Sequence, residues 1–151
     1  VTEIQMADLL REVRRRFDFC LLDAPAGLGR GFQLATCAAD RCVVVTTADA
    51  SSLRDAQHTV MELDRFPSGA LHLVVNRVRK KLLRQLHATI DDAIDKAGLP
   101  LLGVVPEDDA LPLCMNRGVP ILLADGQSAA TAYRNIAKRL QGERVPLLRI
   151  R

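Results

Sequence analysis

The chain has 151 residues, of which 48% are hydrophobic and 26% are charged, and its formal net charge is only +3. This composition suits one soluble globular domain and excludes a disordered tail. The uncharged apolar runs are far shorter than the roughly 18–20 residues that a membrane-spanning helix needs, so we predict a cytoplasmic chain without a membrane span. Residue 1 is Val and no cleavable apolar stretch follows it, so we expect neither a signal peptide nor the native start of the protein at this point.

The thiol and imidazole side chains do not suggest a metal site. The four cysteines are Cys20, Cys37, Cys42 and Cys114. They lie in apolar surroundings without a CxxC or Cys/His cluster, which predicts reduced core residues rather than disulfides or zinc ligands. The three histidines, His58, His72 and His87, fall on different expected elements, so they predict neither a catalytic triad nor a metal centre.

Positive charge is concentrated between Arg77 and Arg84. This segment is either a solvated loop with the start of a helix or a patch that binds nucleic acid. One tyrosine and four phenylalanines provide no platform for stacking bases, so we predict no nucleic-acid partner.

Hydrophobic periodicity switches repeatedly between the helical and the strand pattern. The expected elements, in chain order, are a helix over residues 4–13, a strand at Phe17–Leu22, a helix over 32–39, a strand over 42–47, a helix over 51–65 capped by Ser51 and Ser52, a strand over 71–76, a helix over 83–97, a strand over 101–105, a short helix after Pro106 and a long helix over 128–140. Short β-branched strands that alternate with helices predict right-handed βαβ crossovers and a parallel sheet. The predicted class is therefore α/β, with helices on both faces of a Rossmann-like sheet, in a single domain over residues 1–151.

Polar residues are predicted at the carboxyl end of every strand. Asp23 follows the first strand, Thr46 and Thr47 end the second, Asn76 ends the third, and Pro106–Asp108 follow the fourth. Ligands of open α/β sheets bind at these ends, where helix N-termini favour anions.

The turn after the first strand suits a phosphate and a metal ion. A carboxylate at Asp23 can hold magnesium through water, and the small residues around Gly27 and Gly29 allow backbone N–H groups to approach a phosphate. The alternative is that Asp23 only caps a turn, with the two glycines supplying positive φ angles.

Five motifs together resemble one family. In order and spacing, "FDFCLLDAPAGLG", "ADRCVVVTTADASSLRDA", "LVVNRV", "LLGVVPEDDAL…NRGVPI" and "AYRNIAKRL" are similar to the second half of the MinD branch of the MinD/ParA deviant-Walker ATPases. The similarity runs from about Val1 to about Pro146. It implies part of a P-loop NTPase-type sheet, and ATP and magnesium as cofactors.

The resemblance assigns roles to individual residues. Asp23 would be the Walker B aspartate, acting on magnesium through water, and Gly27 would position phosphate or water within a switch segment. Asn76, together with Arg77, would contact the adenine end of the nucleotide, and Pro106, Glu107 and Asp108 would line the adenine and ribose pocket. A side-chain amide does match the donor and acceptor edge of adenine, but Asn76 could equally be a turn former at a strand end.

The chain departs from the family pattern at the phosphate site. The family begins with a glycine-rich P-loop that carries lysines and a magnesium-binding Ser or Thr, and no Gly-x-x-x-x-Gly-Lys-Ser/Thr occurs here. We expect about the first hundred residues of the family fold to be missing, so that ATP and magnesium binding require that part. The segment after Leu140 is too short for the family's C-terminal membrane helix, so we expect no membrane anchor in this chain.

Two functions follow from the resemblance. The first is the C-terminal part of an ATPase that dimerises across its nucleotide, places the division site and binds the inner face of the membrane peripherally when intact. Its regulatory partners, of the MinC or MinE kind, would bind Ser51–Arg65, although this helix could also be an ordinary solvated surface. The second is a non-catalytic interaction module derived from the same fold. A flagellar-number or plasmid-partition ATPase also remains open.

Overall fold

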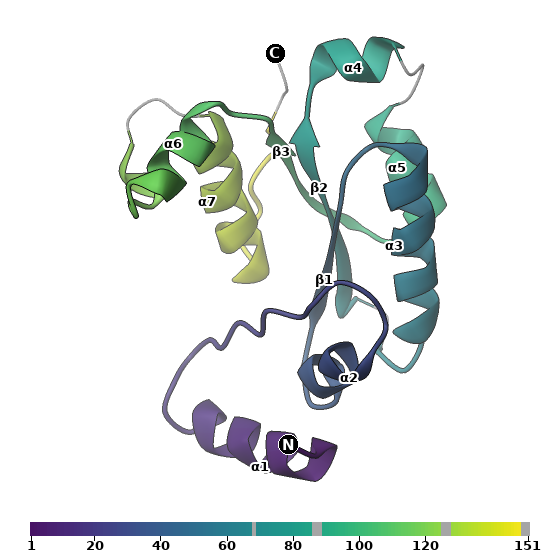
Figure 1. Cartoon of the computed structure of the whole chain (residues 1–151), viewed down its shortest axis with the longest axis vertical. Helices are drawn as coiled ribbons and strands as arrows, with labels where there is room; N and C mark the ends of the chain where they lie inside the picture. The colour runs from purple at the N-terminus through teal and green to yellow at the C-terminus, as the bar shows by residue number, and fades with distance from the viewer. Residues whose placement is uncertain (68, 86–88, 125–127, 149–151) are drawn as a thin grey trace.

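The computed structural model describes residues 1–67, 69–85, 89–124 and 128–148. Its elements, in chain order, are α1 (Glu3–Arg14), α2 (Arg30–Thr36), β1 (Cys42–Thr46), α3 (Ala50–Glu62), β2 (Leu71–Val78), α4 (Lys80–Gln85), α5 (Ile90–Ala97), β3 (Leu101–Pro106), α6 (Ala110–Asn116), the 3₁₀ helix η1 (Ile121–Leu123) and α7 (Ser128–Leu140). The strands form a three-stranded parallel sheet in the order β1-β2-β3 (Figure 1). The predicted α/β class is therefore confirmed.

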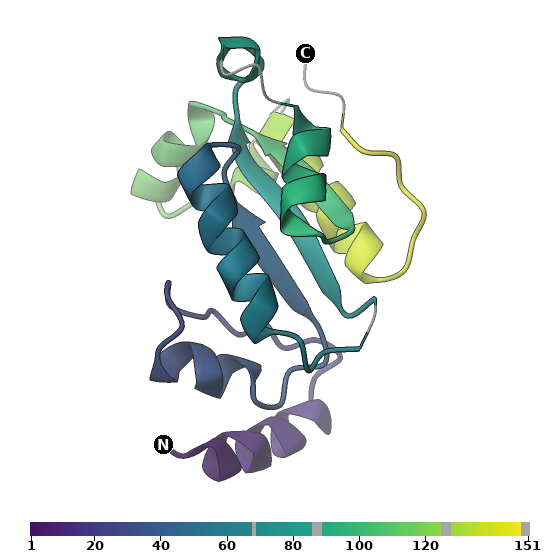
Figure 2. The same cartoon turned by 90° about the vertical axis from the view of Figure 1, so that its right-hand side faces the viewer.

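Helices cover both faces of the sheet. Helices α3 and α5 pack on one face, and α7, with η1 and α6 beside it, packs on the other (Figures 1 and 2). The central strand β2 alternates between the two cores, since Leu73 and Val75 join the cluster under α3 and α5, whereas Val74 joins the cluster under α7. In the described part of the chain, no helix is long and apolar enough to cross a membrane.

The helix predicted over residues 83–97 is wrong as one continuous element. It is replaced by α4 and α5, and residues 86–88 lie outside the described part. Thr89 has the extended backbone of an N-cap, with φ −121° and ψ 166°. Its hydroxyl accepts a hydrogen bond from the Asp92 N–H at 3.1 Å, and the Asp92 carboxylate accepts one from the Thr89 N–H at 2.6 Å. This reciprocal capping box starts a new helix, α5, at Ile90.

The strand predicted at Phe17–Leu22 does not form. The segment has no regular secondary structure and no partner strand among the described residues, and Phe17, Phe19 and Leu21 are exposed. A strand is stabilised by a neighbour that accepts and donates its backbone hydrogen bonds, and apolar side chains alone do not supply them. The apolar pattern of this segment therefore does not make it a strand in the described chain.

In the described structure, strand β1 has one unpaired edge and one face that no helix covers fully. Its pairing with β2 uses one edge, and no described strand pairs with the other. Val44 packs under α3, whereas Val43 and Val45, which point to the opposite face, are 37% and 60% exposed. The sheet therefore ends in an apolar surface that its own helices leave uncovered.

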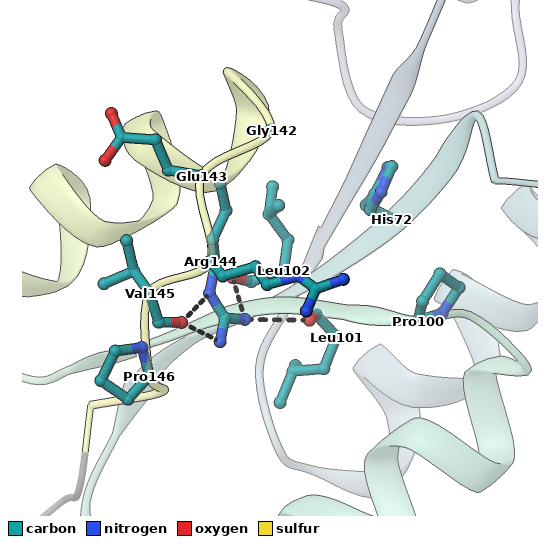
Figure 3. Close-up of a pocket in the computed structure, with 10 residues that line it drawn as sticks. His72, Pro100, Leu101, Leu102, Gly142, Glu143, Arg144, Val145 and Pro146 are labelled. Carbon is teal, nitrogen blue, oxygen red and sulfur yellow. Dashed lines mark hydrogen bonds between the residues drawn. The ribbon is translucent and has the colours of Figure 1, made fainter.

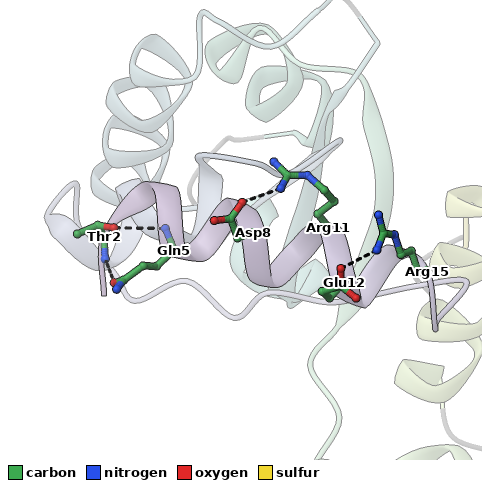
Figure 4. Close-up of polar contacts among 6 residues, drawn as sticks. All are labelled: Thr2, Gln5, Asp8, Arg11, Glu12 and Arg15. Atoms are coloured by element: carbon green, nitrogen blue, oxygen red, sulfur yellow. Dashed lines mark hydrogen bonds and ion pairs between the residues drawn. The ribbon is translucent and has the colours of Figure 1, made fainter.

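Helices α1 and α2 lie together at the N-terminal end of the molecule (Figure 1). Helix α1 begins with a capping box between Thr2 and Gln5, and pairs Asp8 with Arg11 and Glu12 with Arg15 along its exposed side (Figure 4). Exposed pairs of this kind contribute only a few tenths of a kcal/mol each. The position of α1 relies on few tertiary contacts, one of which is the ion pair of Arg14 with Asp40 at 2.7 Å.

A close contact between β3 and α7 leads to a stability prediction. A Cβ at Gly103 would overlap the Ile136 side chain of α7, so Gly103→Ala is expected to lower the free energy of unfolding by about 1–3 kcal/mol. Urea unfolding followed by circular dichroism at low protein concentration measures the change. Gly29→Ala is the control, since its new Cβ would meet no neighbouring atom. In an Ile136→Ala background, Gly103→Ala should lower the free energy of unfolding by much less, because the overlapping side chain is gone. An equal loss in both backgrounds would show that the strain does not come from Ile136.

Candidate functional site

The carboxyl end of β2 is irregular at Asn76 and Arg77. The strand was predicted to end at Asn76, but it continues to Val78. Its pairing with β3 shifts register between Val75 and Val78. Arg77 adopts a positive φ of 53°, and the Asn76 side-chain oxygen accepts a hydrogen bond from the Arg77 N–H at 2.9 Å. An asparagine amide that holds its neighbour's backbone stabilises such an uncommon conformation. The register shift therefore brings Asn76 and Arg77 beside the end of β3.

Glu107 joins the ends of β2 and β3. Its carboxylate accepts hydrogen bonds from Arg77 at 3.0 Å and Arg79 at 2.5 Å, and its backbone N–H donates to the Val78 carbonyl at 3.1 Å. The Glu107 side chain is 20% exposed, whereas those of the two arginines are 67% and 59% exposed. The hydrogen bonds from Arg79, and then from Arg77, lower the pKa of Glu107 below its usual value. Glu107 thus stays ionised and clamps the two loops together.

Asp108 is used to start two helices. Its carboxylate accepts hydrogen bonds from the Ala110 N–H of α6 at 3.1 Å and from the Ala129 N–H of α7 at 3.2 Å. The Ser128 hydroxyl donates to it at 3.3 Å. A carboxylate in this position satisfies free backbone donors and complements the positive ends of both helices. The predicted pocket residues Glu107 and Asp108 therefore hold the shape of the loop with their side chains.

The structure brings together the site residues predicted on β2 and β3. Pro106 ends β3 opposite Val78, so Asn76, Arg77 and the loop Pro106–Asp108 form one cluster at the carboxyl edge of the sheet. Within the described residues, the Asn76 amide N–H groups donate to no acceptor, so they are available to a ligand.

In the described structure, no hydrogen bond or ion pair joins Asp23 or Gly27 to this cluster. Both are exposed on the segment between α1 and α2, and in the described chain Asp23 makes no hydrogen bond or ion pair. Gly27 has a φ of 86°, as a glycine-dependent turn predicts, and a Cβ there would meet no atom within 4 Å. No described group of three His, Cys, Asp or Glu side chains could hold a metal ion by itself.

The end of β1 carries a polar network that joins the predicted Thr47 to Asp49, a residue that was not predicted. Asp49 is the N-cap of α3, in place of the predicted Ser51 and Ser52, which lie inside the helix. Its carboxylate accepts hydrogen bonds from the Thr47 hydroxyl at 2.5 Å and the Ser52 N–H at 3.0 Å. The bond from Thr47, then those from Ser52, hold the pKa of Asp49 far below its usual value. The sequence signal was an Asp three residues before a Ser at the start of an amphipathic helix.

Comparison with known proteins places this geometry in a family. Residues 2–140 match the family model described as cellulose biosynthesis protein BcsQ. Among curated proteins, the septum site-determining protein MinD of Bacillus subtilis is 37% identical over 145 residues, which cover 95% of this chain and 54% of that protein.

Solved MinD structures have the same fold over nearly the whole chain. The MinD cell division protein of Aquifex aeolicus superposes with a TM-score of 0.91 at 30% identity, over 99% of this chain and 64% of that one. The same relative is known in a MinC:MinD complex, with a TM-score of 0.91. MinD of Pyrococcus horikoshii, solved with Mg-ADP, has a TM-score of 0.78 at 24% identity, covers 92% of this chain and 56% of that one, and supports the fold alone.

These matches cover different shares of the two proteins compared. They cover almost all of this chain, which spans about half the length of the curated relatives that it matches. The carboxyl-edge cluster and the parallel sheet thus lie on a scaffold shared with part of a longer protein. The chain belongs to the family described as cellulose biosynthesis protein BcsQ and is a partial relative of the MinD/ParA ATPases.

Proposed function

We propose that this chain supplies the base-binding side of the ATP site in a MinD-like ATPase. The observation that carries the proposal is the cluster of Asn76, Arg77 and Pro106–Asp108 at the carboxyl edge of the parallel sheet. Nucleotides bind at that edge in open α/β folds. The Asn76 amide would face the adenine, while Glu107 and Asp108 would hold the loop that lines the adenine and ribose.

The metal side of the site would depend on Asp23 and Gly27. A lone exposed carboxylate without a partner of its own fits magnesium held through water, because magnesium retains most of its water ligands in proteins. The bound ion would neutralise phosphate charge during attack of water on the γ-phosphate. Asp23 would orient the ion's water shell, and the Gly27 N–H would position phosphate or water. The phosphate cradle itself would come from a P-loop segment.

In the intact protein this ATPase would dimerise across its nucleotide and direct the placement of a division site. The outward side of α3, which presents Arg54, Asp55, His58 and Met61, would receive a regulatory partner. Support for a protein partner, though not for its position, comes from the MinC:MinD complex of the Aquifex aeolicus relative. The intact protein would reach the inner face of the membrane only peripherally.

A second candidate follows from the family model. Its description as cellulose biosynthesis protein BcsQ favours an ATPase that positions a cellulose-producing assembly rather than a septum. The same nucleotide chemistry would serve either role. Localisation of the tagged intact protein, at mid-cell or at sites of cellulose export, separates the two.

Asn76→Ala is expected to weaken ATP and ADP binding equally, by about tenfold each, because a contact to the base does not sense the γ-phosphate. Calorimetry on the full-length protein, reconstructed with a P-loop-bearing N-terminal part, measures both affinities. Asn116→Ala removes an exposed amide on α6 and is the matched control.

Asn76→Asp separates the base contact from a role in the turn. It keeps an oxygen that can accept the Arg77 N–H but loses the amide donor. We expect it to weaken nucleotide binding as the alanine variant does. Wild-type affinity in Asn76→Asp, or unequal losses for ATP and ADP in Asn76→Ala, would contradict a base contact.

A further inference from the structure

A pocket of about 550 Å³ opens at the amino-terminal edge of the sheet, opposite the candidate nucleotide site. Strand β2 contributes His72, the start of β3 contributes Pro100–Leu102, and the segment after α7, residues 142–146, closes one side (Figure 3). Its walls are apolar at Pro100, Leu101 and Val145. The pocket is therefore a separate concave surface, which the proposed ATP site does not use.

Two arginines, Arg139 and Arg144, line this pocket without a carboxylate partner in the described structure, and a third, Arg41, lies near His72. Arg139, half-buried, donates only to backbone carbonyls, those of Val145 at 2.6 Å and Leu102 at 3.0 Å. Arg41 donates to the Leu140 carbonyl at 3.0 Å, and Arg144 makes no hydrogen bond within the described residues. Carbonyl dipoles satisfy guanidinium N–H groups but leave the positive charges uncompensated.

His72 adds an imidazole to the wall of the same pocket. Its Nδ1 is buried and has no hydrogen-bond partner within the described chain. Burial, and then the charge of Arg41, lower the pKa of His72 below its ordinary value. The Arg144 side chain extends toward His72, whereas the Glu143 carboxylate points away from it (Figure 3). Positive charge therefore gathers on one side of the pocket, where an anionic group would compensate it.

We propose that this pocket binds an oxyanion, a phosphate or carboxylate group carried by a small molecule. Arg144 would pair with the anion, the Nε2–H of His72 would donate a hydrogen bond to it, and the carbon skeleton of the ligand would lie on Pro100 and Leu101. Charge-assisted hydrogen bonds from a guanidinium are among the stronger polar contacts in proteins. Because the pocket includes the segment after α7, bound ligand would hold that segment against β3.

Hydrogen–deuterium exchange measured by mass spectrometry tests this site at low micromolar protein. One arm titrates inorganic phosphate and the other acetate, at constant ionic strength, which tells a phosphate site from a carboxylate site. Saturable protection of peptides covering residues 70–73 and 139–146 is expected, with half-saturation in about the millimolar range.

Matched arginine variants decide the specificity of this response. Arg144→Ala should raise the half-saturating concentration at least about tenfold. Arg16→Ala, which also removes an exposed positive charge but at a residue that does not line the pocket, should leave it unchanged. Arg144 is exposed and makes no hydrogen bond or ion pair within the described residues, so its replacement should cost the fold little. Absent protection in both arms, or equal protection in the two variants, would overturn the proposal.

Discussion

Asp23→Asn is expected to abolish ATP turnover in the full-length protein reconstructed with a P-loop-bearing N-terminal part, lowering the rate by at least about a hundredfold. The carboxylate is exposed and has no partner among the described residues, so its removal costs the fold little. Its proposed task is to order the water shell of magnesium, which a neutral amide does poorly. Steady-state phosphate release measures the rate.

Asp18→Asn is the matched control for this substitution. Asp18 lies on the same exposed segment and also makes no hydrogen bond or ion pair in the described chain. It should turn over ATP at the wild-type rate, and both variants should unfold at the same urea concentration. Wild-type turnover in Asp23→Asn would remove Asp23 from the mechanism, while a shared loss in both variants would point to the segment rather than to the carboxylate.

The isolated chain is expected to self-associate and to bind ATP no more tightly than about millimolar. Leu21 is 90% exposed, Phe19 67% and Val45 60%, and one edge of β1 is unpaired in the described structure. Unpaired strand edges and apolar patches recruit other chains. Unsatisfied backbone groups at about 1–3 kcal/mol each would rival the roughly 5–15 kcal/mol stability of a small domain. Weak ATP binding follows from the absence of P-loop amides and lysine.

Light scattering, combined with an ATP titration, measures both properties. Val45→Lys places a charge on the uncovered face of β1 and should shift the chain toward the monomer. Met61→Lys is the control, since Met61 is 72% exposed on α3, away from that face, and its replacement should leave association unchanged. A stable wild-type monomer with micromolar ATP affinity would show that the site is complete without a P-loop.

The pattern of residues along the sequence was enough to predict the fold class and most of the strands. The alternation of β-branched strands with amphipathic helices predicted the α/β class and the three strands that form. Polar residues at the ends of those strands identified Asn76 and Pro106–Asp108 as neighbours, because parallel strands present their carboxyl ends at one edge. These inferences succeeded because side-chain periodicity and strand direction depend on residues that are close in sequence.

Only the tertiary structure decided how polar side chains are used and which strands pair. The sequence predicted that Pro106–Asp108 line a nucleotide pocket, and only the structure shows that the carboxylates of Glu107 and Asp108 bind Arg79, which follows β2, and the starts of α6 and α7. Phe17–Leu22 has the composition of a strand, yet it stays unpaired in the described chain because a strand depends on a neighbour's hydrogen bonds. Hydrogen-bond partners distant in sequence are set by packing, so the pattern along the chain could not reveal them.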